Sequence, residues 1–567
     1  MLRRKNRACH PELPACHPEE RAQRASRRIV SLFVLTMSVT VFFLLAAACS
    51  QRGATNIETT SLTIVQQREP RSLNPLFENG TASKEFGELI FSYLLTWNSH
   101  GQLVPDVARQ VPTLANGGIS SDGLTITYHL RPNVRFSDGT PLTANDCIAT
   151  FHAIMNPHLL VQSRYGYDRI SALNAPTPYT LVIHLRKPFA PILTLFFAPM
   201  GFPILPKHSI THIANLNTSS FNEAPIGSGP YRVVRWNHGN RIDLVANSFF
   251  YRGIPHIAHL ILRFVPSPNV AIEQLQTGEA QFFFNDEDWS TIPQLRTLAH
   301  IRTLVTPMNG IGALIFNLHA SPTNAIAIRR AVAFGLNIPM LVSRSYRNAI
   351  TASHATRGLF MEMANDRAWP MLPFRPDLAA QSLQRDGWKF DGHHIRTKDG
   401  KPLRMLLAIA AGTPSDAAMA AQIRQELLSI GIDVEIKTYA MTQFAAPAEA
   451  GGPVYRGNFN LALYPFVPGD DPDTTEQFAC NRIPPNGYNK PRICDPKIDA
   501  LLLAGRQTYD PIVRANIYRR LQGQLARDLP MLPLFQARGV NAFTSRLHGV
   551  SGSVATVFWN VYHWHFK

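Results

Sequence analysis

Residues 105–155 constrain the fold of this chain more than any other stretch. Apolar and polar residues alternate over residues 124–130, which is the period of a half-buried strand. Asp138-Gly139 predicts a turn, and Thr143-Ala-Asn-Asp146 predicts the start of a helix. The apolar residues of the following stretch, 148–155, recur at helical spacing. The sequence therefore predicts a strand, a turn and a helix in that order.

This order of residues resembles the family 5 solute-binding proteins of bacterial ABC importers, which include dipeptide-, oligopeptide- and nickel-binding proteins. The family pattern reads approximately dG-strand-LR-x-x-V-x-F-x-D-G-x-P-L-T-A-x-D-V, and the chain departs from it at Cys147, where the family usually has Val. Glu69–Pro75 resembles the family's opening motif, and Pro225–Tyr231 resembles its G-T-G-P-Y segment. The resemblance covers roughly residues 60–567. It implies an α/β, bilobed periplasmic-binding-protein-like fold of type II, with an enlarged first lobe and two mixed-sheet lobes joined by a two-segment hinge.

The domain organisation follows from the same resemblance. We expect the first lobe, with an extra subdomain, over 61–308, the second lobe over 309–539, and a return to the first lobe over 540–567. An amphipathic helix over Ala417–Gly431 leads into a strand that starts at Ile432, a step typical of an α/β lobe. The last strands are expected around Val540–Phe543 and over Val557–Trp564.

The first 48 residues are interpreted as a basic leader followed by a lipoprotein signal peptide. An uncharged apolar run, Ile29–Ala48, follows Arg27-Arg28, and Ala46-Ala-Ala-Cys49 resembles the bacterial lipobox. The resemblance implies cleavage before Cys49 and acylation of its thiol, with residues 49–60 as a tether. An uncleaved transmembrane anchor is the alternative, because the run is just long enough to span a bilayer. Both interpretations place the remaining chain outside the cytoplasm.

Charge and motifs exclude several function classes. Of the formal net charge of +16, the residues after the leader carry +11, without a dense Lys/Arg tract or interleaved aromatic residues. The sequence therefore does not predict nucleic-acid binding. The patterns HExxH, GxSxG and Walker A do not occur. We expect no catalytic residues, no resident metal and no cofactor, and hence no enzyme.

The resemblance implies a transport function. The expected protein is an extracytoplasmic, lipid-anchored substrate-binding component of an ABC importer in the periplasm or cell envelope. It would bind a short peptide between its lobes as a monomer and deliver it to two membrane permeases that work with two cytoplasmic ATPases. Nickel or a metal chelate, an oligosaccharide and an opine-like compound remain open as ligands. An exported hydrolase and a peptide-binding chaperone are the alternatives from other classes.

The candidate ligand contacts come from two segments. In peptide-binding relatives, an Asp in a W-x-x-D-x-x-D/E-P stretch meets the peptide α-amino group. The corresponding stretch here is Pro465–Asp473, in which Phe466 takes the Trp position and Asp470 aligns only with a gap. The predicted ligand contacts are Glu69, Phe466, Gly469, Asp470 and Asp471. A turn capped by Asp side chains is the alternative interpretation, and the ligand carboxylate would pair with an Arg or Lys.

Two cysteines near the end of the chain are expected to form a disulfide. Cys480 and Cys494 lie in a chain that is predicted to be exported, and an oxidising compartment favours their pairing. Related dipeptide-binding proteins carry a bridge at a similar place. The alternative is a pair of buried free thiols.

Overall fold

The computed structural model describes residues 61–567 except 79–80, 162, 200, 212, 214, 286–288, 351, 353–356, 391–393, 470 and 554–555. The predicted signal peptide, the lipidation site Cys49 and the tether lie outside the described residues. Asp470, a predicted ligand contact, also lies outside them. Residues 61–567 belong to one compact unit.

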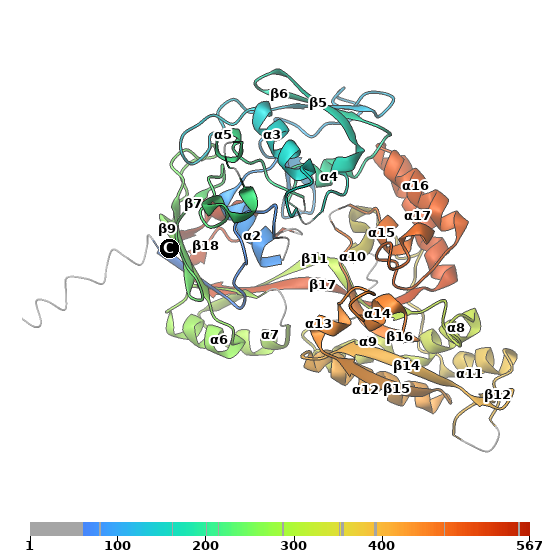
Figure 1. Ribbon diagram of the computed structural model, residues 1–567. Coiled ribbons are helices and arrows are strands. Elements are labelled where there is room, and N and C mark those ends of the chain that lie inside the picture. Colours follow the sequence, from blue (N-terminus) through green and yellow to red (C-terminus); the bar gives the residue numbers. More distant parts are fainter. Residues whose placement is uncertain are drawn as a thin grey trace, which may run out of the picture. The chain divides into compact units, whose positions relative to one another are not determined.

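One sheet of ten strands runs through the described residues (Figure 1). Parallel and antiparallel pairs both occur in it, since β1 lies parallel to its two neighbours whereas β11 is antiparallel to β16 and β17. The strand order is β15 (Asp433–Tyr439), β14 (Arg404–Ala410), β16 (Leu461–Phe466), β11 (Ile301–Phe316), β17 (Met531–Thr544), β10 (Phe282–Asn285), β1 (Ser61–Gln66), β9 (His259–Phe264), β8 (Arg241–Ala246) and β7 (Tyr231–Asn237).

The long strands β11 and β17 lie side by side and carry the chain from one half of this sheet to the other (Figure 1). We call the part of the protein around β10, β1, β9, β8 and β7 the first half, and the part around β16, β14 and β15 the second half. Residues 301–307 of β11 pair with residues 538–544 of β17, whose end also pairs with β10. Beyond a register shift between Pro307 and Ile311, β11 pairs with β16 and with the start of β17. The chain therefore changes halves twice near the predicted lobe boundaries after residues 308 and 539. The exact limits of the lobes stay a prediction.

Alternate side chains of β11 enter two different cores of the second half. Leu314 and Phe316 belong to a cluster with β14 and helix α12 (Pro414–Ser429), whereas Ala313 and Ile315 pack with helix α17 (Pro511–Asp528). Successive strand residues point to opposite faces of a sheet, so this alternation shows that both faces are covered.

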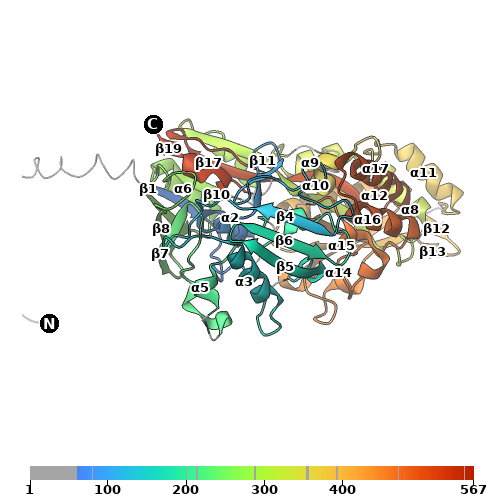
Figure 2. The same cartoon turned by 90° about the horizontal axis from the view of Figure 1, so that it is seen from above.

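The predicted strand–turn–helix unit is confirmed in the first half. Strand β4 (Thr125–His129) pairs with β6 (Thr180–Leu185), which also pairs with β5 (Ile170–Thr177). Helix α3 (Ala144–Met155) packs against β5 and β6, as Figure 2 shows. At its start Asp146 accepts hydrogen bonds from the backbone N–H and the hydroxyl of Thr143, at 2.8 and 2.9 Å, so a carboxylate holds the first turn.

The remaining elements are shorter or cover the sheets. The other helices of the first half are α2 (Thr81–Ile90), α4 (Ile192–Leu195), α5 (Lys207–Ile210), α6 (Pro268–Thr277) and α7 (Ile292–Leu295). Those of the second half are α8 (Ile326–Gly335), α9 (Ile338–Ser345), α10 (Arg357–Phe360), α11 (Pro376–Arg385), α13 (Met441–Phe444), α14 (Pro453–Arg456), α15 (Thr475–Phe478) and α16 (Pro496–Gln507). Small two-stranded sheets pair β2 (Leu95–Trp97) with β3 (Leu103–Pro105), β12 (Thr397–Lys398) with β13 (Lys401–Pro402), and β18 (Leu547–His548) with β19 (His565–Phe566).

Two predictions for the end of the chain have different outcomes. Residues Val540–Phe543 pair with β10, which confirms a strand that returns to the first half. The strand predicted over Val557–Trp564 is wrong, because Phe558–His563 form a 3₁₀ helix. Three buried apolar residues in this helix and directly after it, Phe558, Val561 and Trp564, recur every third residue, which is the period of a 3₁₀ turn.

No single helix among the described residues is long and apolar enough to cross a membrane, and only the bent pair of α8 and α9 reaches the required length and composition together.

Candidate functional site

A pocket of about 630 Å³ lies between two stretches of chain that are far apart in the sequence. One wall comes from the connection between α3 and β5, and the other comes from residues 455–490. A volume of this size suits a small-molecule ligand. The lining residues are Ser163, Tyr165, Tyr455, Tyr464, Pro465, Phe466, Val467, Pro468, Glu476, Gln477, Arg482, Tyr488 and Lys490.

A second pocket of about 640 Å³ has a different origin. All its lining residues come from helices and loops of residues 330–372 and 523–529, including Arg330 and Arg527. A ligand there would contact only the second half of the chain. The first pocket is therefore the candidate site for a ligand that both halves must contact.

Strand β16 brings its carboxyl end to the pocket. Tyr464, Pro465 and Phe466 end the strand, and Val467 and Pro468 continue the wall. The Phe466 ring is 3% exposed and stacks on Phe478 with ring centroids 6.4 Å apart. Core packing thus fixes the direction in which this wall leaves the sheet.

A disulfide-closed loop supplies the charged part of the wall. Cys480 and Cys494 are bonded, with their Cα atoms 4.5 Å apart, and Arg482, Tyr488 and Lys490 lie between them. The predicted disulfide is therefore confirmed. It limits the conformations open to a segment that has hardly any regular secondary structure.

The buried side chain of Asn489 holds this loop from inside. Its amide donates to the carbonyl oxygens of Ala479 at 2.9 Å and Ile493 at 2.7 Å, and its side-chain oxygen accepts from the Ile493 N–H at 3.2 Å. Arg492 donates to the carbonyl oxygen of Tyr455 at 2.6 Å, which ties the loop to α14. Since buried amides of this kind are costly to leave unpaired, these bonds fix the place of the neighbouring Lys490.

Lys490 lies within a cage of three tyrosines. Its Nζ atom is 4.3 Å from the ring centroid of Tyr464, 4.9 Å from that of Tyr455 and 5.1 Å from that of Tyr488. The residue is 5% exposed, and burial lowers the pKa of its ammonium from 10.5 to about 7. Within the part of the chain that the structure describes, no carboxylate forms an ion pair with Lys490. We refer to Tyr455, Tyr464 and Tyr488 as the tyrosine cage.

Glu476 and Arg482 add a second charged feature to the same wall. Arg482 Nε lies 3.1 Å from Glu476 Oε1, in an ion pair whose angles do not make a hydrogen bond. Burial raises the pKa of the Glu476 carboxyl group above its ordinary value. The pocket therefore presents groups of both charge signs.

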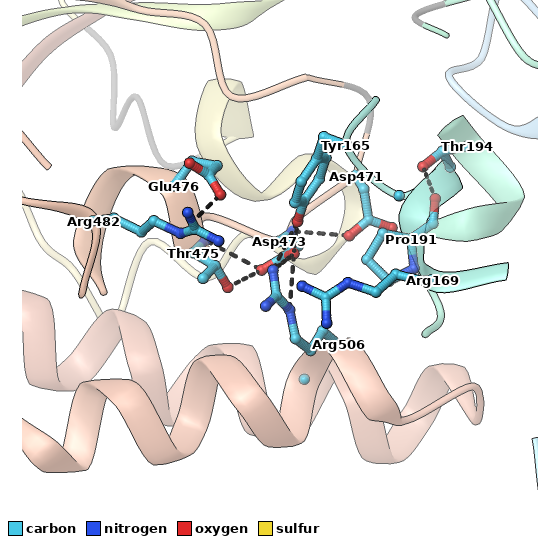
Figure 3. A network of polar contacts seen from close by, with 12 residues as sticks. Tyr165, Arg169, Pro191, Thr194, Asp471, Asp473, Thr475, Glu476, Arg482 and Arg506 are labelled. Carbon is cyan, nitrogen blue, oxygen red and sulfur yellow. Dashed lines mark hydrogen bonds and ion pairs between the residues drawn. The ribbon is translucent and has the colours of Figure 1, made fainter. Parts of the chain in front are cut away.

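A polar network joins the two walls of the pocket (Figure 3). Arg506 of α16 donates to Asp473 at 2.8 Å and to the Tyr165 hydroxyl at 2.7 Å, and that hydroxyl donates to Asp473 at 3.1 Å. The Asp473 side chain is only 3% exposed, which strengthens the pairing. Burial and the Asp473 charge raise the pKa of Tyr165, so its hydroxyl keeps its proton and continues to donate. Tyr165 belongs to the first half and Arg506 to the second, so the network fixes how the halves meet at this pocket.

Comparison with known proteins identifies the family of this chain. The model of the bacterial extracellular solute-binding proteins, family 5 Middle, matches residues 103–482. The chain belongs to this family. Di/tripeptide-binding protein 2 of Pseudomonas aeruginosa (strain UCBPP-PA14) is 26% identical over 470 residues, which are 77% of this chain and 83% of that protein.

Solved structures show the same fold as this family 5 protein. The oligopeptide-binding protein AppA of Bacillus subtilis, in complex with a nonapeptide, matches with a TM-score of 0.71 and 21% identity over 89% of this chain and 99% of AppA. NikZ of Campylobacter jejuni, in complex with Ni(L-His), matches with a TM-score of 0.73 and 24% identity over 89% of this chain and 99% of NikZ. The predicted bilobed, type II periplasmic-binding-protein fold is thus confirmed.

The predicted contacts of this solute-binding protein lie in different surroundings. Phe466 lines the pocket. Gly469 lies just past the pocket wall with a φ of 108°, a conformation that favours glycine. The carboxylate of Asp471 is already paired within the protein, because Arg514 donates to both of its oxygens at 2.6 and 3.0 Å.

Glu69 lies in the first half, away from the pocket-lining residues. Its carboxylate accepts from Trp236 Nε1 at 2.8 Å and from the Gly239 N–H at 2.9 Å, so it holds the hairpin of β7 and β8. Its assignment, like those of the other four residues, stays a prediction.

Sequence reasoning missed the tyrosine cage and Lys490. Tyr464 and Tyr455 lie 26 and 35 residues before Lys490, so no local pattern links them. The available signal was the segment Gly-Tyr-Asn-Lys-Pro at 487–491, in which a lysine and an aromatic residue lie inside a predicted disulfide loop. That signal could have identified Lys490 as a candidate, although not its burial.

A metal site was not expected, and the described residues contain no group of three His, Cys, Asp or Glu side chains placed to hold a metal ion.

Proposed function

We propose that this solute-binding protein captures short peptides in the pocket between residues 163–165 and 455–490. It delivers them unchanged to the membrane permease of an ABC importer. The observation that carries the proposal is that one pocket wall holds the ammonium of Lys490, which has no carboxylate partner among the described residues, whereas the Glu476 carboxylate of the same wall is already paired with Arg482. A short peptide is a zwitterion, and each of its ends is costly to bury without an opposite charge.

The names of relatives support peptides as the ligand class. They include a di/tripeptide-binding protein, an oligopeptide-binding protein and the glutathione-binding protein GsiB of Salmonella. The tyrosines and prolines of the pocket wall offer rigid apolar surface that is compatible with many peptide side chains.

We keep the predicted contacts within this proposal. Phe466 contacts the ligand through the pocket wall. Asp470 follows the lining residue Pro468 by two positions and is the candidate partner of the peptide ammonium. Glu69, Gly469 and Asp471 are weaker candidates, because the carboxylates of Glu69 and Asp471 already have partners in this structure.

The cellular setting completes the proposal. Cleavage before Cys49 and acylation of its thiol anchor the protein to a membrane through residues 49–60. The protein acts as a monomer outside the cytoplasm, with lobes at 61–308 and 309–539 and a return at 540–567. Its partners are the permease and ATPase subunits of the importer. It does not change its ligand chemically.

A thermal-shift screen tests the function. The purified protein is heated with di- to pentapeptides, with nickel–histidine and with oligosaccharides. A ligand that binds only the folded state stabilises it by about 2.7 kcal/mol at one hundred times its dissociation constant. We expect peptides to raise the melting temperature. A rise with nickel–histidine or a sugar alone would contradict the peptide assignment, and hydrolysis of a bound peptide, seen by mass spectrometry, would contradict transport without chemical change.

A further inference from the structure

We propose that Lys490, inside the tyrosine cage, is the anion subsite of the pocket and pairs with one carboxylate group of the ligand. This inference rests on the proposed function in one respect, which is that this pocket takes the ligand. Beyond the proposed function, it identifies the residue that pairs with the negatively charged group of the ligand, and it gives the number of negative charges on that group.

The first argument is the contrast between Lys490 and the other buried or half-buried cations among the described residues. Arg514 is paired with Asp471 at 2.6 Å, Arg506 with Asp473 at 2.8 Å, and Arg252 with Asp106 at 2.8 Å. Arg329 and Arg396 have no carboxylate partner in the described part of the chain, but both donate hydrogen bonds to backbone carbonyl oxygens. Buried charges are normally paired in this way, because an unpaired one is costly. Among the described residues, the Lys490 ammonium is at least as buried as these arginines but has neither a carboxylate nor a carbonyl partner, and it contacts only the tyrosine rings. A ligand carboxylate would complete the pair.

The second argument is the direction and rigidity of the side chain. Lys490 is one of the residues that line the pocket. The disulfide between Cys480 and Cys494 and the hydrogen bonds of Asn489 hold its backbone in place. A charge that is already held in the binding geometry loses little freedom when the ligand arrives, so its attraction is retained as affinity.

The third argument is the chemistry of the cage. Tyrosine faces stabilise a cation but carry no net charge, so they hold the Lys490 ammonium without neutralising it. Burial raises the pKa of Tyr464 to about 12 and that of Tyr455 beyond its ordinary value, so their phenols stay neutral. Because Lys490 occupies the cage, a ligand ammonium would be repelled there.

The charge balance selects a carboxylate. Arg482, the other basic residue of the wall, is already paired with Glu476 at 3.1 Å, which leaves the single charge of Lys490. One carboxylate neutralises one ammonium, whereas a phosphate dianion would leave a negative charge without a partner in a buried site. The subsite therefore takes a monoanionic carboxylate, such as a peptide C-terminus.

The test compares free acids with amides by calorimetric titration. The probes are trialanine, trialanine amide and the monocarboxylate butyrate, and the proteins are the full chain, Lys490→Met and the control Lys497→Met, which replaces an exposed lysine of α16. We expect the wild type and the control to bind trialanine at least tenfold more tightly than its amide. We expect Lys490→Met to bind the two peptides equally. An acid-to-amide ratio that is unchanged in Lys490→Met overturns the inference and leaves the peptide function standing.

Butyrate separates the inference from the proposed function. If trialanine does not bind the wild type but butyrate binds only when Lys490 is present, the peptide function fails and the anion subsite stands. If neither probe binds the wild type, both are refuted.

A measurement on the wild type covers the case in which Lys490→Met does not fold. Acetylation of Lys490 by acetic anhydride, followed by mass spectrometry, should be slowed by the free acid that binds and not by trialanine amide. Equal rates would overturn the inference.

Discussion

Replacing Lys490 by Met should stabilise the ligand-free protein, although it removes a residue of the proposed binding site. Burial lowers the pKa of Lys490 from 10.5 to about 7, so the folded state carries a charge that it disfavours. Each pKa unit corresponds to about 1.4 kcal/mol, which makes the cost of this charge about 5 kcal/mol below pH 7. Met has a similar length and no charge. The substitution Lys490→Met should therefore raise the free energy of unfolding by up to about 5 kcal/mol at pH 6.

The pH dependence has a definite sign. Between pH 7 and 10.5 the unfolded chain holds a proton on Lys490 more often than the folded protein does, so the stability of the wild type rises with pH in this window. The advantage of Lys490→Met should therefore fall by about 1.4 kcal/mol per pH unit and nearly vanish at pH 10. The other titratable groups at the cage are Tyr455, Tyr464 and Tyr488, and Glu476 and Arg482 line the same pocket.

Guanidinium unfolding of both ligand-free proteins at pH 6, 8 and 10, followed by tryptophan fluorescence, measures this difference. The control is Lys497→Met, whose exposed side chain should have no comparable effect. A gain that is the same at pH 6 and pH 10, or a loss of stability at pH 6, would refute the reasoning.

Ligand binding should have the opposite pH dependence. A carboxylate attracts only the protonated form of Lys490, whose pKa in the free protein is about 7. The affinity for trialanine should be constant below pH 7 and fall about tenfold per pH unit above it, until the higher pKa of the complex is reached. Titration calorimetry from pH 6 to 9 measures this trend, and an affinity that rises above pH 7 would contradict it.

Two further predictions concern the structure around the pocket. Asp471→Ala should destabilise the protein by about 3–5 kcal/mol in guanidinium unfolding, because it leaves the buried charge of Arg514 without its partner. Asp433→Ala, at a more exposed ion pair, should cost less than about 1 kcal/mol, and equal losses would show that burial is not the cause. Reducing the disulfide between Cys480 and Cys494 should cost about 3 kcal/mol and weaken trialanine binding, since the loop that it closes carries Lys490. Unchanged affinity in the reduced protein would show that the loop needs no disulfide to place this residue.

Local sequence patterns determined the elements whose stability is itself local. The alternation over residues 124–130 predicts β4, and Thr143 with Asp146 predicts the start of α3, because both signals act within a few residues. The disulfide could be predicted from the expected compartment and the number of nearby cysteines. The strand predicted over Val557–Trp564 was wrong, because its apolar residues also satisfy a helical period.

The tertiary structure decided which charges are free to meet a ligand. The sequence presents Asp471 as a candidate contact and does not single out Lys490, and only the fold pairs Asp471 with Arg514, 43 residues further along the chain. Only the fold buries Lys490 against Tyr455 and Tyr464 and leaves it facing the pocket. The physical reason is that the burial and pairing of a charge depend on neighbours that are distant in sequence, whereas strand period and helix capping depend on adjacent residues.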